Sequence, residues 1–281
     1  GANLFDRGPI GSGAVNEVAV TQADLNEILD IARTVYQYDP GEIPSSAPNS
    51  DEKLLIKLDA NLTDQHRASF TYNYNDGFNI SGSDRDLNEI EFFNHHYERG
   101  AKLNSYVGAL YSDWTDNFST ELRAGYTKLD NRQISVGGTD FGEIRVELDN
   151  VDVYLGGDDS RQSNKLNYDL FNFAVGGRYT KGNHNFSFGL EHESLDIFNL
   201  FVQHTETEIR FENEFGRSAI DNFRQGFASA IYYNNAPSNN PDDAAAVWGY
   251  SSNTIYAQDE WDFNDELTLI GGLRYDWYTT G

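Results

Sequence analysis

The stretch from Asn253 to Thr280 reads NTIYAQDEWDFNDELTLIGGLRYDWYTT, two runs of alternating apolar and polar residues around a polar turn at Asn264–Glu266. Side chains alternate across a strand, so the second run has one apolar and one polar face. The apolar face carries Leu267, Leu269, Gly271, Leu273, Tyr275 and Trp277. At about 3.3 Å per residue, Leu267–Trp277 crosses an apolar layer of roughly 25 Å when tilted. The pattern predicts a membrane-spanning hairpin.

Aromatic residues mark both ends of this hairpin. Trp261 and Phe263 lie at the turn end, and Tyr275 and Trp277 lie at the far end. Transmembrane barrels place aromatic side chains at both membrane–water interfaces, so these four residues are the predicted aromatic girdle. Asp259 departs from the pattern, because alternation puts its carboxylate on the apolar face.

Three further hairpins repeat this arrangement. They span Lys53–Asn75, Lys102–Leu129 and Tyr168–Leu195, each with two alternating runs around a turn of three or four residues. In the first run of the Lys102–Leu129 hairpin, the predicted apolar face carries Leu103, Val107, Ala109 and Tyr111, with Tyr106 and Leu110 out of phase.

The connections between the hairpins are far longer than the turns within them. They run from about twenty to about fifty residues, beyond the ordinary length of loops. Outer-membrane barrels alternate short periplasmic turns with long extracellular loops, whereas a soluble sandwich has more evenly spaced turns. The sequence therefore predicts an all-β fold with about eight antiparallel transmembrane strands.

The hairpin also resembles a known family. Tyr256–Trp261, Leu267–Leu269 and Gly272–Asp276 are together similar to the barrel hairpin of TonB-dependent outer-membrane receptors. Thr21–Gly41 resembles a segment of the Oar-like branch of that family. The resemblance implies the outer membrane of a Gram-negative bacterium and a barrel of about 22 strands with a plug in its lumen. On this interpretation the chain is an internal portion of the barrel that lacks the plug and the carboxyl-terminal strands.

Several local signals locate other elements. Thr21 and Asp24 have the spacing of a capping box, and the apolar residues that follow have helical spacing up to Asp39–Gly41. We expect residues 1–50 to form an extracellular-loop segment with this short helix, and residues 51–281 to form the barrel portion. Ser218–Phe223 is predicted to be a short capped helix, and Glu143–Tyr154 a hairpin above the membrane.

Composition limits the possible functions. The 281 residues contain 45 acidic and 20 basic side chains, a formal charge of -25, so nucleic acid is an unfavourable partner. The absence of cysteine excludes disulfides and thiolate metal sites. Mean hydropathy is -0.62, and the sequence has no apolar run long enough for a transmembrane helix. Barrel strands remain compatible with this value, because their apolar residues occupy alternate positions.

No motif in the sequence indicates catalysis, a cofactor or a metal. His95 and His96 are adjacent on an extended loop and point apart, so they are interpreted as exposed histidines and not as a chelating pair. Gly156–Asp159 and Asp242–Asp243 lack the spacing of a calcium loop and are interpreted as solvated acidic loops.

Charged residues on the membrane strands indicate which face is enclosed. Arg123, Arg178, Arg274 and Asp276 all fall on polar faces. A charge facing lipid costs roughly 2–4 kcal/mol near the midplane, so these four residues are the predicted lumen-facing set. Their expected role is ion pairing within the wall or with a plug.

The resemblance implies a function in transport and not an enzyme. A TonB-dependent receptor takes up a scarce ligand across the outer membrane, energised by the inner-membrane TonB complex, which would act through the missing plug region. Two alternatives stay open at this point. A passive porin would share the wall but conduct ions, and a soluble or surface β-rich adhesin would have scattered aromatic residues.

Overall fold

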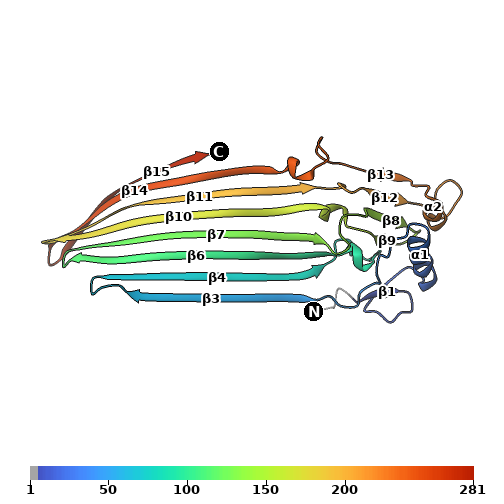
Figure 1. The fold of residues 1–281 in the computed structure, drawn as a ribbon, viewed down its shortest axis with the longest axis horizontal. Helices are drawn as coiled ribbons and strands as arrows, with labels where there is room; N and C mark the ends of the chain where they lie inside the picture. The colour runs from blue at the N-terminus through green and yellow to red at the C-terminus, as the bar shows by residue number, and fades with distance from the viewer. Residues whose placement is uncertain (1–5) are drawn as a thin grey trace.

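The computed structural model describes residues 6–281, and its main feature is one long antiparallel sheet (Figure 1). Its strands are β3 (Asn49–Asn61), β4 (His66–Ser81), β6 (Tyr97–Thr115), β7 (Phe118–Ser135), β10 (Ser163–Lys181), β11 (His184–Val202), β14 (Ala246–Asn264) and β15 (Leu267–Thr280). The spatial order is β15-β14-β11-β10-β7-β6-β4-β3, so each strand pairs with its neighbour along the chain. The four predicted hairpins and the eight predicted strands are confirmed. The sheet is open, with β3 and β15 at its edges.

The strand register divides the sheet into an apolar and a polar face. One row of directly paired residues on the apolar face runs across all eight strands: Ala60, Ala68, Leu110, Leu122, Val175, Leu190, Ile255 and Tyr275. The next row, on the opposite face, is Asn61, Arg67, Tyr111, Glu121, Gly176, Gly189, Tyr256 and Arg274. The alternation predicted from single strands is therefore coherent across the sheet.

The predicted phase of β6 is wrong. Ala109 pairs with Arg123 and Tyr111 with Glu121, which places them on the polar face. Leu110 pairs with Leu122 and lies on the apolar face instead. Both faces of β6 carry large side chains, so its own alternation is weak and the neighbouring strands determine its register.

The long connections fold together at one end of the sheet into a second unit, here called the loop lobe (Figure 1). Its five-stranded sheet contains β13 (Ala230–Tyr232), β12 (Glu208–Phe211), β8 (Glu143–Glu147), β9 (Asp152–Leu155) and β5 (Glu89–Glu91), in that spatial order. The lobe also contains β1 (Arg7–Pro9), β2 (Asn16–Val18), the helices α1 (Gln22–Thr34) and α2 (Ala219–Gln225), and the short 3-10 helices η1 (Phe93–His95), η2 (Asp159–Arg161) and η3 (Pro241–Ala244). The predicted hairpin above the membrane is confirmed as β8–β9.

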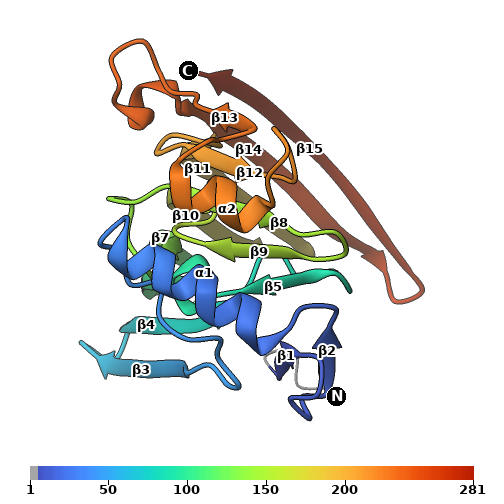
Figure 2. The same cartoon turned by 90° about the vertical axis from the view of Figure 1, so that its right-hand side faces the viewer.

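The lobe has its own hydrophobic core. Figure 2 shows α1 and α2 lying on the outer side of the five-stranded sheet. Ile28 and Ile31 of α1, Phe223 of α2, and Val146 and Leu155 of the sheet are fully buried between these layers. Burial of such side chains contributes about 1.5–3 kcal/mol each, so packing of the helices stabilises the lobe. Within residues 6–281, no helix has the length and apolarity needed to cross a membrane.

Both predicted helix starts are confirmed. Ser218 caps α2, its side chain accepting a hydrogen bond from the Asp221 backbone N–H at 3.1 Å. Thr21 caps α1 in a complete capping box: its Oγ1 accepts from the Asp24 N–H at 3.1 Å, and Asp24 Oδ2 accepts from the Thr21 N–H at 3.3 Å. The two contacts satisfy backbone donors that have no partner within the helix.

Replacing Thr21 with alanine is expected to lower the local stability of α1 by about 1 kcal/mol, because the first-turn donors lose their side-chain acceptor. Hydrogen exchange of the α1 amides in the full-length protein measures this change as faster exchange in the first turn. The matched control is Asp30→Ala, which changes an exposed residue in the middle of the same helix. Equal exchange in both variants would show that the cap contributes nothing.

Candidate functional site

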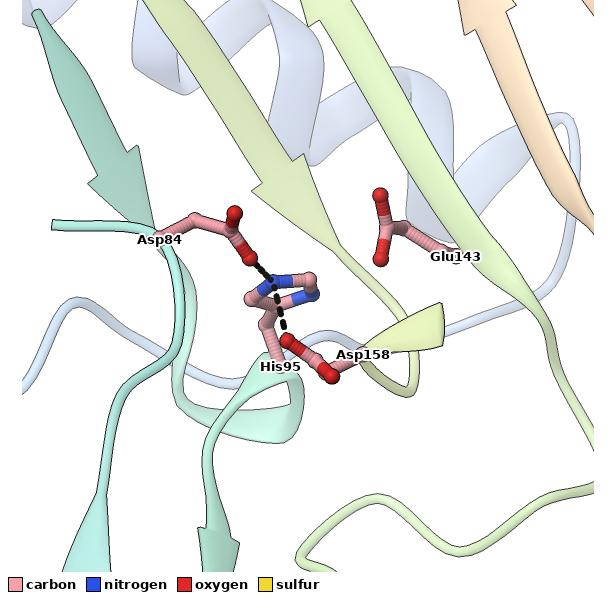
Figure 3. Close-up of side chains that lie close together, drawn as sticks. All are labelled: Asp84, His95, Glu143 and Asp158. Atoms are coloured by element: carbon pink, nitrogen blue, oxygen red, sulfur yellow. Dashed lines mark hydrogen bonds and ion pairs between the residues drawn. The ribbon is translucent and has the colours of Figure 1, made fainter. Parts of the chain in front are cut away.

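A cluster of ionisable side chains is buried where the lobe meets the end of the long sheet. Figure 3 shows Asp84, His95, Glu143 and Asp158 converging from separate segments of the chain. One ligand-type atom from each residue lies within 4.8 Å of all the others. His95, Glu143 and Asp158 are buried, and Asp84 is partly exposed.

Hydrogen bonds fix the orientation of His95. Its Nδ1 lies 3.1 Å from the Gly156 carbonyl oxygen, and its Nε2 lies 2.8 Å from Asp84 Oδ2. The same Nε2 lies 3.7 Å from Asp158 Oδ2. One side of the ring is therefore held by the backbone and the other faces carboxylates.

The pKa values in the cluster reflect competition between burial and charge. Burial opposes protonation of His95, but the Asp84 hydrogen bond and the charges of Glu143 and Asp158 raise its pKa to about 10. Burial raises the pKa of Glu143 to about 8 and that of Asp158 to about 6, because a carboxylate loses its hydration there. His96, next in the chain, has its pKa lowered to about 4 by burial.

The interpretation of His95 and His96 as exposed loop residues is wrong, since both are buried. Gly156–Asp159 is also not a simple solvated loop. Gly156 has a φ of 84°, a left-handed conformation that lets the chain turn directly after β9, two residues before the buried Asp158. By contrast Asp242 is exposed and forms an ion pair with Lys165 at 2.8 Å, as a solvated acidic loop does.

No short motif reveals this cluster in the sequence. The four residues belong to two different connections between hairpins, and only the folding of the lobe brings them together. The residue types carry a weak signal at most, because acidic side chains occur throughout these connections. The sequence therefore predicts the local strand β8 but not the position of Glu143 at its start.

The predicted lumen-facing residues share one face of the long sheet. Arg123, Glu191, Thr254 and Asp276 belong to a single row of paired positions, with Ala174 between Arg123 and Glu191. Arg123 forms an ion pair with Glu121 of its own strand. Arg178 lies opposite Ser119 and Ser187 on the same face.

Arg274 is the centre of a hydrogen-bonded network on this polar face. Its Nη2 lies 2.9 Å from Asp276 Oδ1, and it donates to Thr254 Oγ1 at 3.0 Å. The Thr254 hydroxyl in turn donates to Asp276 Oδ1 at 2.5 Å, and Arg274 lies 3.4 Å from Glu191 Oε2. The network joins β11, β14 and β15, consistent with structural ion pairing within the wall.

The predicted girdle residues form two aromatic pairs at opposite ends of the β14–β15 hairpin. The ring centroids of Trp261 and Phe263 are 5.0 Å apart near the turn, and those of Tyr275 and Trp277 are 5.7 Å apart at the far end.

Asp259, the exception on the apolar face, has a partner there. Its Oδ2 lies 2.8 Å from His184 Nδ1. The His184 ring stacks on the Trp261 ring, with the two ring centroids 5.2 Å apart. The pair lies close to the turns, where a charge near the interface costs less than one at the membrane centre.

Residues 26–280 match the family described as outer membrane beta barrel domain. The chain belongs to this family. The match covers most of the sequence and includes all eight long strands, so the prediction of an outer-membrane β-barrel protein of a Gram-negative bacterium is confirmed. The resemblance to outer-membrane receptors is confirmed at the level of this barrel, while the Oar-like branch stays a prediction.

Two solved structures are similar to this outer-membrane β-barrel domain. One is the ferric-catecholate import receptor Fiu from E. coli K12, with 13% identity, a TM-score of 0.48, and coverage of 86% of this chain and 39% of that one. The other is the copper transporter OprC, with 10% identity, a TM-score of 0.44, and coverage of 86% and 32%. The chain thus spans less than half of each structure. Comparison with curated proteins finds no match.

Proposed function

We propose that this outer-membrane β-barrel domain forms part of the wall and the external loops of a TonB-dependent receptor that takes up a scarce ligand. The observation that supports it most is the pair of adjacent rows across eight strands, one without a charged residue and one with Arg67, Glu121 and Arg274. A wall between lipid and an enclosed polar lumen requires this arrangement.

The proposal assigns roles to the two faces. Arg123, Arg178, Arg274 and Asp276 face the lumen, where they pair with one another, with wall residues or with a plug. Trp261 and Phe263 belong to the periplasmic girdle, and Tyr275 and Trp277 to the outer one. Because a charge on the lipid face is costly, the row that contains Arg274 is better suited to the lumen.

The lobe lies outside the cell on this proposal. All four hairpin turns are at the opposite end of the sheet, which is the pattern of short periplasmic turns and folded extracellular loops (Figure 1). Residues 1–50 then contribute α1 to the external side and residues 51–281 contribute the barrel strands. The ligand binds the lobe and the apex of a plug, and the plug connects the receptor to the inner-membrane TonB complex. No enzymatic step is part of this function.

The proposal is tested by the conductance of the full-length protein in planar lipid bilayers. A receptor with a plug in its lumen is expected to conduct very little, and deletion of the plug-coding region upstream of the barrel is expected to open the pore. A large steady conductance of the full-length protein would instead support a passive porin. A reading frame without any plug-coding region would overturn active uptake, and recovery without detergent would favour a soluble adhesin.

A further inference from the structure

The buried cluster of the lobe carries a second inference, independent of transport. We propose that Asp84, His95, Glu143 and Asp158 bind one first-row divalent metal ion, of the Mn²⁺ or Zn²⁺ type, which fastens two connections of the loop lobe to each other. Asp84 and His95 belong to the connection between β4 and β6. Glu143 and Asp158 belong to the connection between β7 and β10. An ion held by all four residues would therefore cross-link segments that the barrel strands alone do not join.

The orientation of His95 is that of a metal ligand. Metal-binding histidines usually donate one ring N–H to a carbonyl or carboxylate, which fixes the ring and leaves the other nitrogen for the metal. In this lobe Nδ1 lies 3.1 Å from the Gly156 carbonyl oxygen, so it carries the donated hydrogen. Nε2 then faces the carboxylates of Asp84 and Asp158, which approach the ring from two sides (Figure 3).

The cluster holds more carboxyl groups than basic side chains. The nearby Glu91 is already satisfied, because Arg85 Nε lies 3.1 Å away and the N–H groups of Ser83 and Asp84 donate to it. That leaves Asp84, Glu143 and Asp158 around the His95 imidazole, with Arg161 Nε 4.0 Å from Asp158. Buried carboxylates are strongly unfavourable unless they are paired or bind a metal, and a divalent cation supplies the missing charge.

Asp158 provides independent support for a ligand. Its side chain is 2% exposed, and its Oδ1 has no hydrogen-bond partner within residues 6–281. Arg161 Nε lies 4.0 Å from this oxygen. Glu143 accepts one hydrogen bond, from the Asp159 N–H at 2.7 Å, through Oε2. Buried acceptors of this kind are rare without a bound ion or water.

The donor set determines the class of metal. Three carboxylates and one imidazole, with no sulfur, suit Mn²⁺, Fe²⁺ or Zn²⁺, whereas Ca²⁺ takes oxygen ligands only. Metal–ligand bonds of about 2.0–2.2 Å place opposite ligands of one ion about 4 Å apart. The ligand atoms here lie within 4.8 Å of one another, so small side-chain movements complete the site.

A neighbouring cluster provides an internal comparison. Asp159 Oδ2 and Glu208 Oε2 lie 3.2 Å and 3.5 Å from His204 Nδ1, but Glu208 also forms an ion pair with Arg210. Its charge is therefore balanced by protein side chains, and it is not part of the proposed site.

The test uses the full-length protein in detergent, stripped with a chelator and then titrated with Mn²⁺ or Zn²⁺. Metal content after equilibrium dialysis is expected to saturate at one equivalent, and the electron paramagnetic resonance signal of free Mn²⁺ is expected to fall in parallel. Glu143→Gln, which keeps the size of the side chain, is expected to weaken binding by about 100-fold or more, because even supporting residues change affinity by about 10- to 100-fold.

Three variants make the test specific. Glu147→Gln makes the same change on the same strand outside the cluster, and His204→Gln alters the neighbouring cluster; both should bind metal as the parent does. Asp84→Asn is the second cluster variant, at the partly exposed ligand, in case Glu143→Gln fails to fold. The absence of saturable binding to the parent protein would overturn the proposal. Unchanged affinity in a folded cluster variant would overturn it too, as would loss of binding in His204→Gln.

Discussion

A lysine at position 175 is expected to destabilise the inserted barrel by about 2–4 kcal/mol, whereas a lysine at position 174 is tolerated. Val175 lies between Leu122 and Leu190 on the apolar face, at the middle of the alternating run Phe171–Tyr179 of β10. Val175→Lys places an ammonium group in the lipid, where nothing replaces its hydration. Ala174 lies between Arg123 and Glu191 on the polar face, so Ala174→Lys places the same group in the lumen.

The two variants differ by one position and carry the same new side chain, so each is the control for the other. Folding of the full-length protein into lipid vesicles, followed by gel mobility with and without heating and by denaturant titration, measures the difference in stability. Equal destabilisation by both substitutions would show that neither face is enclosed. Greater destabilisation by Ala174→Lys would mean that the two faces have been assigned the wrong way round.

Phe223→Ala is expected to destabilise the loop lobe by about 3–5 kcal/mol while leaving the barrel assembled. The Phe223 ring is fully buried and stacks on the Tyr36 ring, with the two ring centroids 4.9 Å apart. Its centroid lies 5.2 Å from that of the Phe211 ring. The Tyr36 hydroxyl also donates to the Phe223 carbonyl oxygen at 2.5 Å. Alanine would leave a cavity where α1, α2 and the five-stranded sheet meet.

Limited proteolysis and hydrogen exchange of the full-length protein distinguish the lobe from the barrel. We expect faster exchange in β8, β9 and α1, with unchanged exchange in β10 and β11. Phe215→Ala is the control, because that side chain is 65% exposed. If the barrel strands lost protection together with the lobe, the two units would form one cooperative structure and the separate core described above would be wrong.

The wall could be predicted from the sequence because its information is local. Each hairpin carries its own alternation and turn, and adjacent strands are adjacent in the chain, so no distant pairing has to be known. β6 is the informative failure. Tyr111 reads as apolar in isolation, yet its ring lies on the polar face beneath the Arg67 guanidinium, 4.7 Å from the ring centroid. An amphipathic ring suits either face, so periodicity alone did not determine its phase.

The lobe could be predicted only in part, because its contacts join distant segments. The caps at Thr21 and Ser218 and the β8–β9 hairpin depend on neighbouring residues, so the sequence predicts them. β8 pairs in parallel with β12, and β5 pairs in parallel with β9. Each pair joins strands from two different connections, and no local pattern in the sequence encodes such a pairing. The prediction of His95 fails for the same reason: its ring contacts Gly156, 61 residues away in the sequence, and Asp158 of the same distant connection.

The open edges of the long sheet affect how the chain behaves in isolation. Within residues 6–281, β3 and β15 each pair with one neighbouring strand only. The backbone N–H and C=O groups along their outer edges can therefore pair with another strand. Because the sheet has an even number of antiparallel strands, β15 of one copy runs antiparallel to β3 of the next copy when their outer edges pair. Such head-to-tail joining is heterologous, so copies of the 281-residue chain in water are expected to pair edge to edge and assemble.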